Sequence, residues 1–396
     1  MKTVQLSLFS FFLLLTLLPF KTEALEFPHQ CAAEDRVTIA GVGDLLFHRR
    51  LQVQAYTRTD GFKTLWAPVA DLLKDADITY ANLEGPVAPG VRGGGVAVKD
   101  PGLRFDNRVY TTYPLFNYHP RVVQDLIDSG FDIVSTANNH SLDRGSLGAE
   151  KTIESLEKGG MPYTGTRLKS APRDFAEITE TNGHRIAWLA CTYSTNGLPD
   201  PNSMVLQCYK DREEVLETIA ALSSDDSVDA VILTPHWGAE YQPFPNQRQK
   251  TLARQALTAG ATAIVGAHPH VPQIWEVIEQ DDGRPGVVIY STGNFISNQR
   301  RMPQRTGLIA WLDLCPAENG KLALSKVEYT PTWVIIDGKG LRVSNNDGAS
   351  GKINSVASLN HIKRLLPDDS VRALPSYLLQ EQAVAPVDSP LHYFRP

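Results

Sequence analysis

Six short runs of apolar residues recur along the chain, and each one ends in polar residues. The runs are rich in Val, Ile and Ala and show little alternation of apolar and polar positions, which is typical of strands buried on both faces. This pattern predicts β-strands in the segments 36–44, 76–85, 131–140, 229–238, 262–270 and 286–295.

Helical patterns lie between these runs. The patterns at 120–130 and 146–160 end in glycine, at Gly130 and at Gly159–Gly160, as expected where a helix stops. Because the predicted strands alternate with helices, the pattern indicates an α/β fold. The predicted helices cover residues 68–76, 120–130, 146–160, 211–224 and 246–260.

The domain predicted from this pattern covers residues 34–340. Two strand-like runs near its end, 306–314 and 321–336, complete its sheet structure. The remaining segment, 341–396, is polar and Pro-rich, and we interpret it as a C-terminal extension with one amphipathic piece at 356–366.

A long connection at 88–118 interrupts the strand–helix pattern and begins with a Gly-rich stretch. Connections of this length inside a compact domain are uncommon and are usually functional or disordered. Two interpretations stay open: a substrate-binding loop or lid, and a disordered insertion.

The N-terminus has the pattern of a secretory signal peptide over residues 1–24, with Lys2, an apolar stretch and a small residue at Ala24. The alternative is an uncleaved anchor, although the apolar stretch is short of the ~20 residues that span a bilayer. We expect an exported protein, periplasmic or extracellular, held at the membrane if the segment is not cleaved.

Four cysteines permit two disulfides in an exported chain, with three possible pairings. Cys191 and Cys208 flank a single loop, so their pairing is the first hypothesis. The formal net charge is -6 and no basic block occurs, which argues against nucleic acid as a partner.

The polar residues at the strand ends are the strongest functional signal. In open α/β sheets, binding sites collect outside the carboxyl ends of the strands. Carboxylates together with imidazoles suit one or two divalent ions such as Mn, Fe or Zn, whereas Ca prefers oxygen alone. The candidate metal ligands are Asp44, Glu84, Asn139, His236, His268 and His270.

Six motifs resemble the CapA family of bacterial poly-γ-glutamate capsule synthesis proteins, which are similar in fold to the calcineurin-like metallophosphoesterases. They are GDLLFHR, ANLEGPV, FDIVSTANNHSLDRG, HWGAEY, GAHPHVPQ and YSTGNF, in family order over roughly residues 37–300. The resemblance implies a four-layer αββα sandwich, with two mixed sheets packed together and helices outside.

The resemblance also implies a role for each candidate ligand. Asp44 and His270 correspond to ligands of a first metal, and Glu84 to a carboxylate that bridges two metals. His140 corresponds to the histidine that donates a proton or stabilises charge at the reacting centre. The ligands of the second metal correspond to Asn139, His236 and His268.

The first motif departs from the phosphoesterase pattern, which has Asp-x-His. Leu46 stands at the histidine position, and the nearby His48 need not point the same way. This departure puts phosphatase chemistry and occupancy by two metals in doubt. Arg49 corresponds to a basic residue of the family itself.

Further residues beside the motifs are candidates for contact with substrate or for support of the ligands. Asp143 and Arg144 either pair with each other or support the site. Trp237 and Tyr241 either stack on substrate or cover the pocket. Asn294 either binds a ligand or holds its own turn.

The resemblance implies a role in synthesis, export or anchoring of poly-γ-glutamate or a related anionic envelope polymer, with hydrolase-type metal chemistry and a possible membrane-bound capsule synthesis complex as partner. Positive charge for the polymer would come from the metals, Arg49, Arg50 and Arg144. The alternatives are an envelope phosphodiesterase or phosphatase, and a non-catalytic polymer-binding subunit, so enzymatic activity itself stays open.

Overall fold

The computed structural model describes residues 27–347 and 353–373. The predicted signal peptide and the last part of the predicted C-terminal extension lie outside the described residues. Among the described helices, none is long and apolar enough to cross a membrane.

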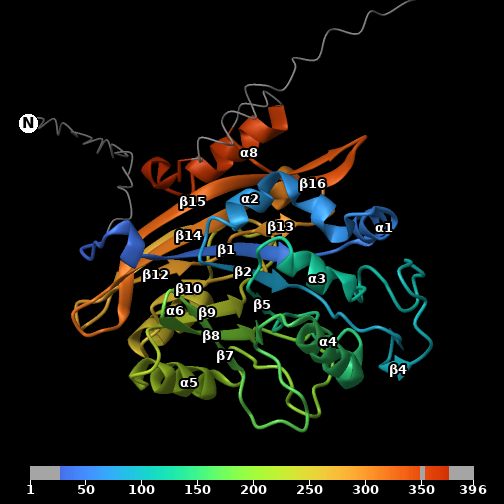
Figure 1. The fold of residues 1–396 in the computed structure, drawn as a ribbon, viewed down its shortest axis with the longest axis horizontal. Coiled ribbons are helices and arrows are strands. Elements are labelled where there is room, and N and C mark those ends of the chain that lie inside the picture. Colours follow the sequence, from blue (N-terminus) through green and yellow to red (C-terminus); the bar gives the residue numbers. More distant parts are fainter. Residues whose placement is uncertain (1–26, 348–352, 374–396) are drawn as a thin grey trace, which may run out of the picture.

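Two β-sheets face each other in the centre of the molecule (Figure 1). The first has the order β16-β15-β14-β1-β2-β5-β6, with β13 paired to β1. Within this sheet, the adjacent strands β1, β2, β5 and β6 run parallel to one another, whereas β14, β15 and β16 pair antiparallel with their neighbours. The strands are β1 (Val37–Leu45), β2 (Ile78–Leu83), β5 (Ile133–Ser135), β6 (Tyr163–Thr164), β13 (Asn294–Ile296), β14 (Thr306–Pro316), β15 (Leu322–Asp337) and β16 (Gly340–Asn345).

The second sheet has the order β11-β12-β10-β9-β8-β7, with a parallel centre and antiparallel edge strands. The apolar pattern did not reveal β7, β8 and β11. The strands are β7 (Ala176–Thr181), β8 (His184–Thr192), β9 (Ala230–His236), β10 (Ala263–Val265), β11 (Trp275–Glu279) and β12 (Pro285–Ile289). A separate small sheet pairs β3 (Val91–Arg92) with β4 (Val96–Ala97).

Helices cover both outer faces, which confirms the expected four-layer αββα sandwich. The first sheet is covered by α1, α2 and α3, and the second by α5 and α6. Helix α8 packs on β14 and β15. The helices are α1 (Arg49–Thr57), α2 (Ala70–Leu73), α3 (Arg121–Ile127), α4 (Gly145–Gly159), α5 (Arg212–Ser224), α6 (Gln247–Thr258), α7 (Met302–Arg305) and α8 (Ile353–Lys363).

The space between the sheets is filled by apolar side chains. Ile39 and Ile78 of the first sheet and Ile232 of the second are buried in one cluster. Tyr80 stacks on Trp188 across the interface, with ring centroids 5.6 Å apart. Because such interiors are close-packed, the two sheets form a rigid platform for the loops at their ends.

Aspartates fasten the amino ends of neighbouring strands in the same way at three places. Asp77 exchanges two hydrogen bonds with Thr38, in which its amide donates to the Thr38 carbonyl and its carboxylate accepts from the Thr38 amide. Asp132 makes the same pair of bonds with Thr79, and Asp229 with Arg185. These carboxylates are therefore satisfied by backbone donors.

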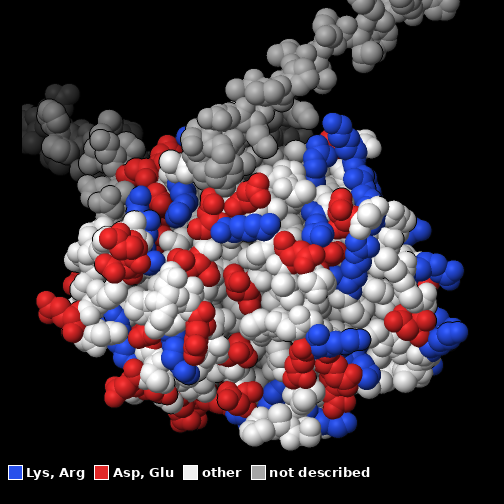
Figure 2. Space-filling view, in the orientation of Figure 1, with Lys and Arg blue, Asp and Glu red and all other residues white. Residues whose placement is uncertain are grey.

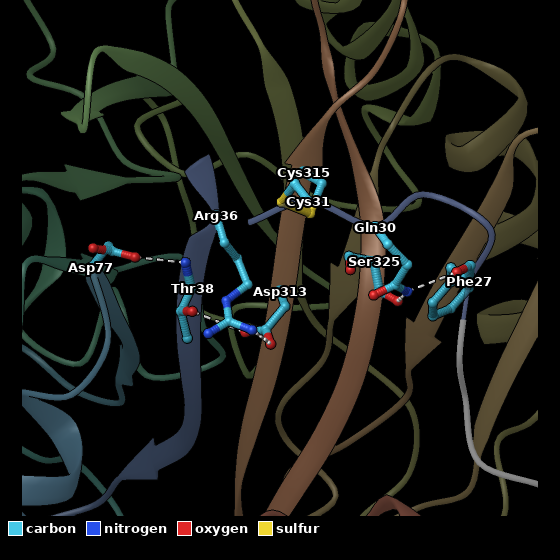
Figure 3. The surroundings of a disulfide bond; sticks show 9 residues. All are labelled: Phe27, Gln30, Cys31, Arg36, Thr38, Asp77, Asp313, Cys315 and Ser325. Carbon is cyan, nitrogen blue, oxygen red and sulfur yellow. Dashed lines mark hydrogen bonds and ion pairs between the residues drawn. A yellow bond between two sulfur atoms is a disulfide. The ribbon is translucent and has the colours of Figure 1, made fainter. Parts of the chain in front are cut away.

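Two disulfides join the four cysteines. Cys191–Cys208 confirms the first hypothesis, and Cys31–Cys315 ties the start of the described chain to β14. Figure 3 shows the second bond beside the Arg36–Asp313 ion pair. Disulfides persist in oxidising compartments, so both bonds indicate a protein outside the cytoplasm.

The segment 88–118 is folded against the domain, so the interpretation as a disordered insertion is wrong. The Asn117 side chain holds it by donating to the carbonyls of Ala88, Val91 and Val109. Tyr110 is fully buried. The segment therefore forms a fixed wall beside the carboxyl end of the first sheet.

Candidate metal centre

The six predicted metal ligands lie together at the carboxyl ends of the strands. They reach this place from β1, β2, β9 and the loops after β5 and β10, which belong to both sheets. Five of the six form two groups whose donor atoms lie within 4.8 Å of one another. One group is Asp44, Glu84 and His270, and the other is Glu84, His236 and His268.

Glu84 is common to both groups. Its side chain is fully buried, and neither carboxylate oxygen has a hydrogen-bond partner. His236 and His270 lie 3.6 and 3.9 Å from its oxygens, beyond hydrogen-bond distance. A buried carboxylate without hydrogen bonds is costly unless a cation or a proton neutralises it. The two groups that share Glu84 could therefore each hold a divalent ion.

The imidazole nitrogens converge as well. His270 Nδ1 lies 2.9 Å from an Asp44 oxygen, and His268 Nδ1 lies 3.2 Å from His236 Nε2. The sixth candidate, Asn139, places its side-chain oxygen 3.0 Å from the same His236 Nε2. Carboxylate, amide and imidazole groups that converge on one point are typical of a metal site.

Burial and charge shift the pKa values of these groups in different directions. Burial, and then the neighbouring Asp44, raise the pKa of Glu84 well above its usual value. Burial lowers the pKa values of His236 and His268 well below the usual range, so both rings stay neutral, as metal ligands must be. For His270, burial is outweighed by Glu84 and Asp44, which raise its pKa to about 9.

The backbone is strained where two of the histidines lie. His268 has φ +98° and His270 has φ +58°, a region that residues other than glycine rarely adopt. The turn is held by Tyr241, whose amide donates to the Pro269 carbonyl, and by Asn294, whose amide group donates to the His270 carbonyl. Strain of this kind collects at functional sites because the surrounding structure must maintain it.

Asn82 and Asn138 support the ligands, a role that the sequence did not reveal. The Asn82 side chain donates to Asp44 Oδ1 at 2.8 Å and lies 3.1 Å from His236 Nδ1. The Asn138 side chain donates to the Leu83 carbonyl, beside Glu84. Both lie at strand ends, so the rule that located the ligands also applies to them.

Gly43 lets the strands approach closely next to Asp44. A Cβ atom at this position would lie 1.8 Å from the Gly293 carbonyl oxygen, so a larger residue would push β1 away from the loop before β13. The Asp44 amide donates to the same carbonyl.

His140 lies beside the donor groups and is oriented by Asp143. Its Nδ1 lies 2.8 Å from Asp143 Oδ2, an oxygen that also accepts from the Phe116 amide. The Phe116 ring contacts the histidine edge-on, with centroids 4.8 Å apart. With Nδ1 engaged, Nε2 is the ring nitrogen left for proton exchange with a ligand.

Arg144 holds the wall rather than facing the site opening. Only 1% of its surface is exposed, and its guanidinium donates to the Asp143 carbonyl and the Leu115 carbonyl and contacts Thr111. It does not form an ion pair with Asp143 among the described contacts. It is therefore placed to support the site and not to meet a polymer at the surface.

Trp237 and Tyr241 differ in position. Trp237 is fully buried under the second sheet and donates to the Tyr290 carbonyl, so it covers the core and offers no face to substrate. Tyr241 is 43% exposed, and its ring centroid lies 6.1 Å from that of His270, at the rim of the site. Asn294 holds its turn, as one of its two interpretations expects, and also bonds to the Gln304 carbonyl.

The first motif, GDLLFHR, contributes no histidine to the donor group of Asp44, Glu84 and His270. Leu46 is buried in the core under the helices of the first sheet. His48 is partly buried, and its Nδ1 accepts from the Asn298 amide at 3.3 Å, outside both donor groups. Arg49 is exposed and lies over the Phe105 ring at 5.7 Å.

Tyr193 is a further residue of the site that sequence reasoning missed. It follows β8, and its ring centroid lies 4.4 Å from that of His268. The residue before it, Thr192, pairs with His236 at the end of the neighbouring strand β9. Because β8 was not predicted, the strand-end rule did not reach this residue.

A family model described as bacterial capsule synthesis protein PGA_cap matches residues 38–299, more than half of the chain. The capsule biosynthesis protein CapA of Bacillus anthracis is 28% identical over 293 residues, covering 70% of this chain and 64% of the relative, which is less than two thirds of its length. The PGA biosynthesis protein CapA of Bacillus subtilis (strain 168) is 27% identical over 308 residues, covering 76% and 75%.

Among solved structures, the NAD nucleotidase NadN of Haemophilus influenzae covers 88% of this chain and 59% of its own, with 11% identity and a TM-score of 0.44. The family match and the Bacillus relatives agree with the motifs at the strand ends. The chain belongs to the family of bacterial capsule synthesis proteins PGA_cap.

Proposed function

We propose that the chain is a divalent-metal-dependent hydrolase that cleaves amide bonds of poly-γ-glutamate or a related anionic polymer during capsule synthesis at the cell envelope. The family supports a role in capsule biosynthesis, and the donor set supports a divalent metal. The single observation that carries the hydrolase proposal is Glu84, which is shared by two donor groups and has no hydrogen bond to either oxygen.

Asp44, Glu84, Asn139, His236, His268 and His270 would hold the metal ions. When bound, divalent ions polarise a carbonyl or phosphoryl oxygen and lower the pKa of water. Asn82 would keep Asp44 and His236 in place through its contacts with both side chains. The fixed wall of 88–118 would restrict the access of bulk water to one side.

His140 would supply the proton that the leaving amine needs. In hydrolysis, a water oxygen bonds to the carbonyl carbon, the carbon–nitrogen bond breaks, and the amine takes up a proton. The contact with Asp143 fixes the imidazole so that Nε2 can donate that proton, which is general acid catalysis. The ring then regains a proton from the attacking water, so His140 returns to its starting protonation state.

One observation favours a second candidate, a non-catalytic polymer-binding subunit. Leu46 replaces the histidine of the Asp-x-His pattern, and its side chain is buried in the core. The first donor group therefore contains three residues only, which weakens the case for a fully loaded two-metal centre.

The test combines metal analysis with a cleavage assay. The purified protein is incubated with Mn, Fe or Zn, and its bound metal is measured. Cleavage of poly-γ-glutamate of defined length is then followed by gel filtration, which measures polymer length, and by the release of new amino groups. We expect the wild type to cleave the polymer. The variant His268→Ala/His270→Ala should lose both the metal and the cleavage activity. The variant His140→Gln should keep the metal and lose the cleavage activity.

The same preparations are assayed on bis-p-nitrophenyl phosphate, which separates amide from phosphodiester hydrolysis. A metal-loaded wild type that cleaves neither substrate would support the binding-subunit candidate. Cleavage of the phosphodiester alone would replace the amide proposal with the envelope phosphodiesterase.

A further inference from the structure

A groove with excess positive charge lies between α1 and the β15–β16 hairpin. It encloses about 430 Å³ and has one acidic residue, Asp337, in its lining. Figure 2 shows Lys and Arg side chains gathered over these elements, at the upper right. We call it the basic groove, and its four basic residues are Arg49, Arg50, Arg58 and Lys339.

The charge of the basic groove is largely uncompensated. Asp337 is engaged by two hydrogen bonds of 2.9 Å from the Arg342 guanidinium. Among the residues that the structure describes, Arg49, Arg50 and Lys339 form no ion pair. In a chain with net charge -6, a local excess of cations favours an anionic ligand at this surface.

Helix stability does not explain two of these arginines. Arg49 and Arg50 open α1, whose first turn contains no acidic residue. The amino end of a helix carries partial positive charge, so arginines there are disfavoured. An anion bound in front of the helix would reverse this penalty.

The basic groove connects with the metal centre through the start of α1. His48 precedes the helix and accepts from the Asn298 amide, while Asn294, four residues earlier, holds the His270 turn. With nine residues, α1 extends about 13 Å from this point to its end. The arginines of the groove therefore follow α1 from its start, next to His48, to Arg58 beyond its end.

We propose that the basic groove holds a polycarboxylate chain so that one of its backbone bonds enters the metal centre. Arginine fits a carboxylate with two parallel hydrogen bonds, and successive carboxylates along an extended polymer can meet successive basic residues. The choice of polymer rests on the proposed function, while the groove itself rests on its charge and position.

The test is binding of fluorescently labelled poly-γ-glutamate by fluorescence anisotropy in the presence of a chelator, so that cleavage plays no part. The variant Arg50→Glu/Lys339→Glu changes two side chains that lack ion pairs in the described structure. The matched control Lys158→Glu/Lys210→Glu changes the net charge equally at exposed positions elsewhere. We expect at least tenfold weaker binding in the groove variant only, and weaker wild-type binding at higher salt.

Binding of the groove variant within twofold of the wild type would overturn the proposal, and so would an equal loss in the control. Single-stranded DNA of equal charge that binds as tightly would overturn the assignment to polycarboxylates. The two proposals fail separately: absent cleavage with intact binding removes the hydrolase, and absent binding with metal-dependent cleavage removes the groove.

Discussion

Carboxylates at the two ends of the strands differ in their hydrogen bonding. At the amino ends, Asp77, Asp132 and Asp229 each accept a backbone N–H of the adjacent strand at 2.6–2.7 Å. At the carboxyl ends, Glu84 is fully buried and accepts no hydrogen bond. The aspartates at the amino ends are hydrogen-bonded within the chain, as is Asp44 at the carboxyl end, whereas Glu84 is left without a hydrogen bond.

The difference shows where stability and function reside. A carboxylate bonded to backbone donors is stabilised in the folded chain, whereas an unpaired buried carboxylate costs free energy until a cation binds. The strained turn at His268 and His270 adds to the cost at the same end. We therefore expect substitutions at the two ends to have opposite effects on stability and on metal affinity.

Glu84→Gln should have the largest effect. The amide removes the shared negative charge, so we expect at least ~100-fold weaker metal binding, in line with losses of tenfold or more when metal sites are altered. Without metal, the same change relieves the burial of an unpaired charge, so the chelated variant should unfold at equal or higher denaturant concentration. Metal titration and urea unfolding measure the two effects.

The matched change at the other end is Asp132→Asn, which should leave metal affinity unaltered. A chelated Glu84→Gln variant that is clearly less stable than the chelated wild type would contradict the comparison, because the contacts of Glu84 with His236 and His270, at 3.6 and 3.9 Å, would then outweigh the cost of burying its charge.

Asp143→Asn should have the next largest effect. Its carboxylate orients His140 and carries negative charge next to the ring, so the amide should reduce metal-dependent turnover by about 10–100-fold. Metal content should stay stoichiometric, and the pH profile of turnover should shift, because the charge beside the imidazole has changed. An unchanged pH profile with reduced turnover would indicate a purely structural role.

The α/β class and the location of the candidate site were predictable because both depend on local patterns, whereas the four-layer sandwich was implied by the resemblance to the CapA family. Buried strands produce continuous apolar runs, and the ligands follow those runs directly, so Asp44, His236 and His268 were found. The partly exposed β7 and β11 lack such runs, and with β8 unrecognised, Tyr193 was missed.

What the sequence could not supply is side-chain direction. Nothing in the motif HWGAEY distinguishes Trp237, buried in the core, from Tyr241 at the rim. Nor does proximity in sequence reveal that Arg144 turns inward while Arg50 faces the basic groove. Both outcomes depend on packing between segments far apart in the chain.

Asp229→Ala should have a smaller effect, on stability alone. It removes the acceptor of the Arg185 amide, so the free energy of unfolding should fall by about 1 kcal/mol. Asp229→Asn keeps a side-chain oxygen and should retain most of the stability. Chemical denaturation of both variants, with metal content measured in parallel, checks the prediction, and a loss of metal would show that the amino end also shapes the site.

His48→Gln should have the smallest effect, visible only as a function of pH. Burial, opposed by a contact with the Leu46 carbonyl, lowers the pKa of His48 to about 4, below the value of ~6.5 expected in the unfolded chain. The folded state thus favours the neutral ring, so its stability is complete above pH ~6.5 and is lost as the pH falls towards 4.

Glutamine does not titrate, so in chelator the wild type should lose stability relative to His48→Gln by up to about 1 kcal/mol over this pH range. Urea unfolding at several pH values measures the difference. If the difference in unfolding free energy between wild type and His48→Gln stays constant from pH 7 to pH 4, His48 is solvated. The buried region that titrates would then end at the donor groups themselves.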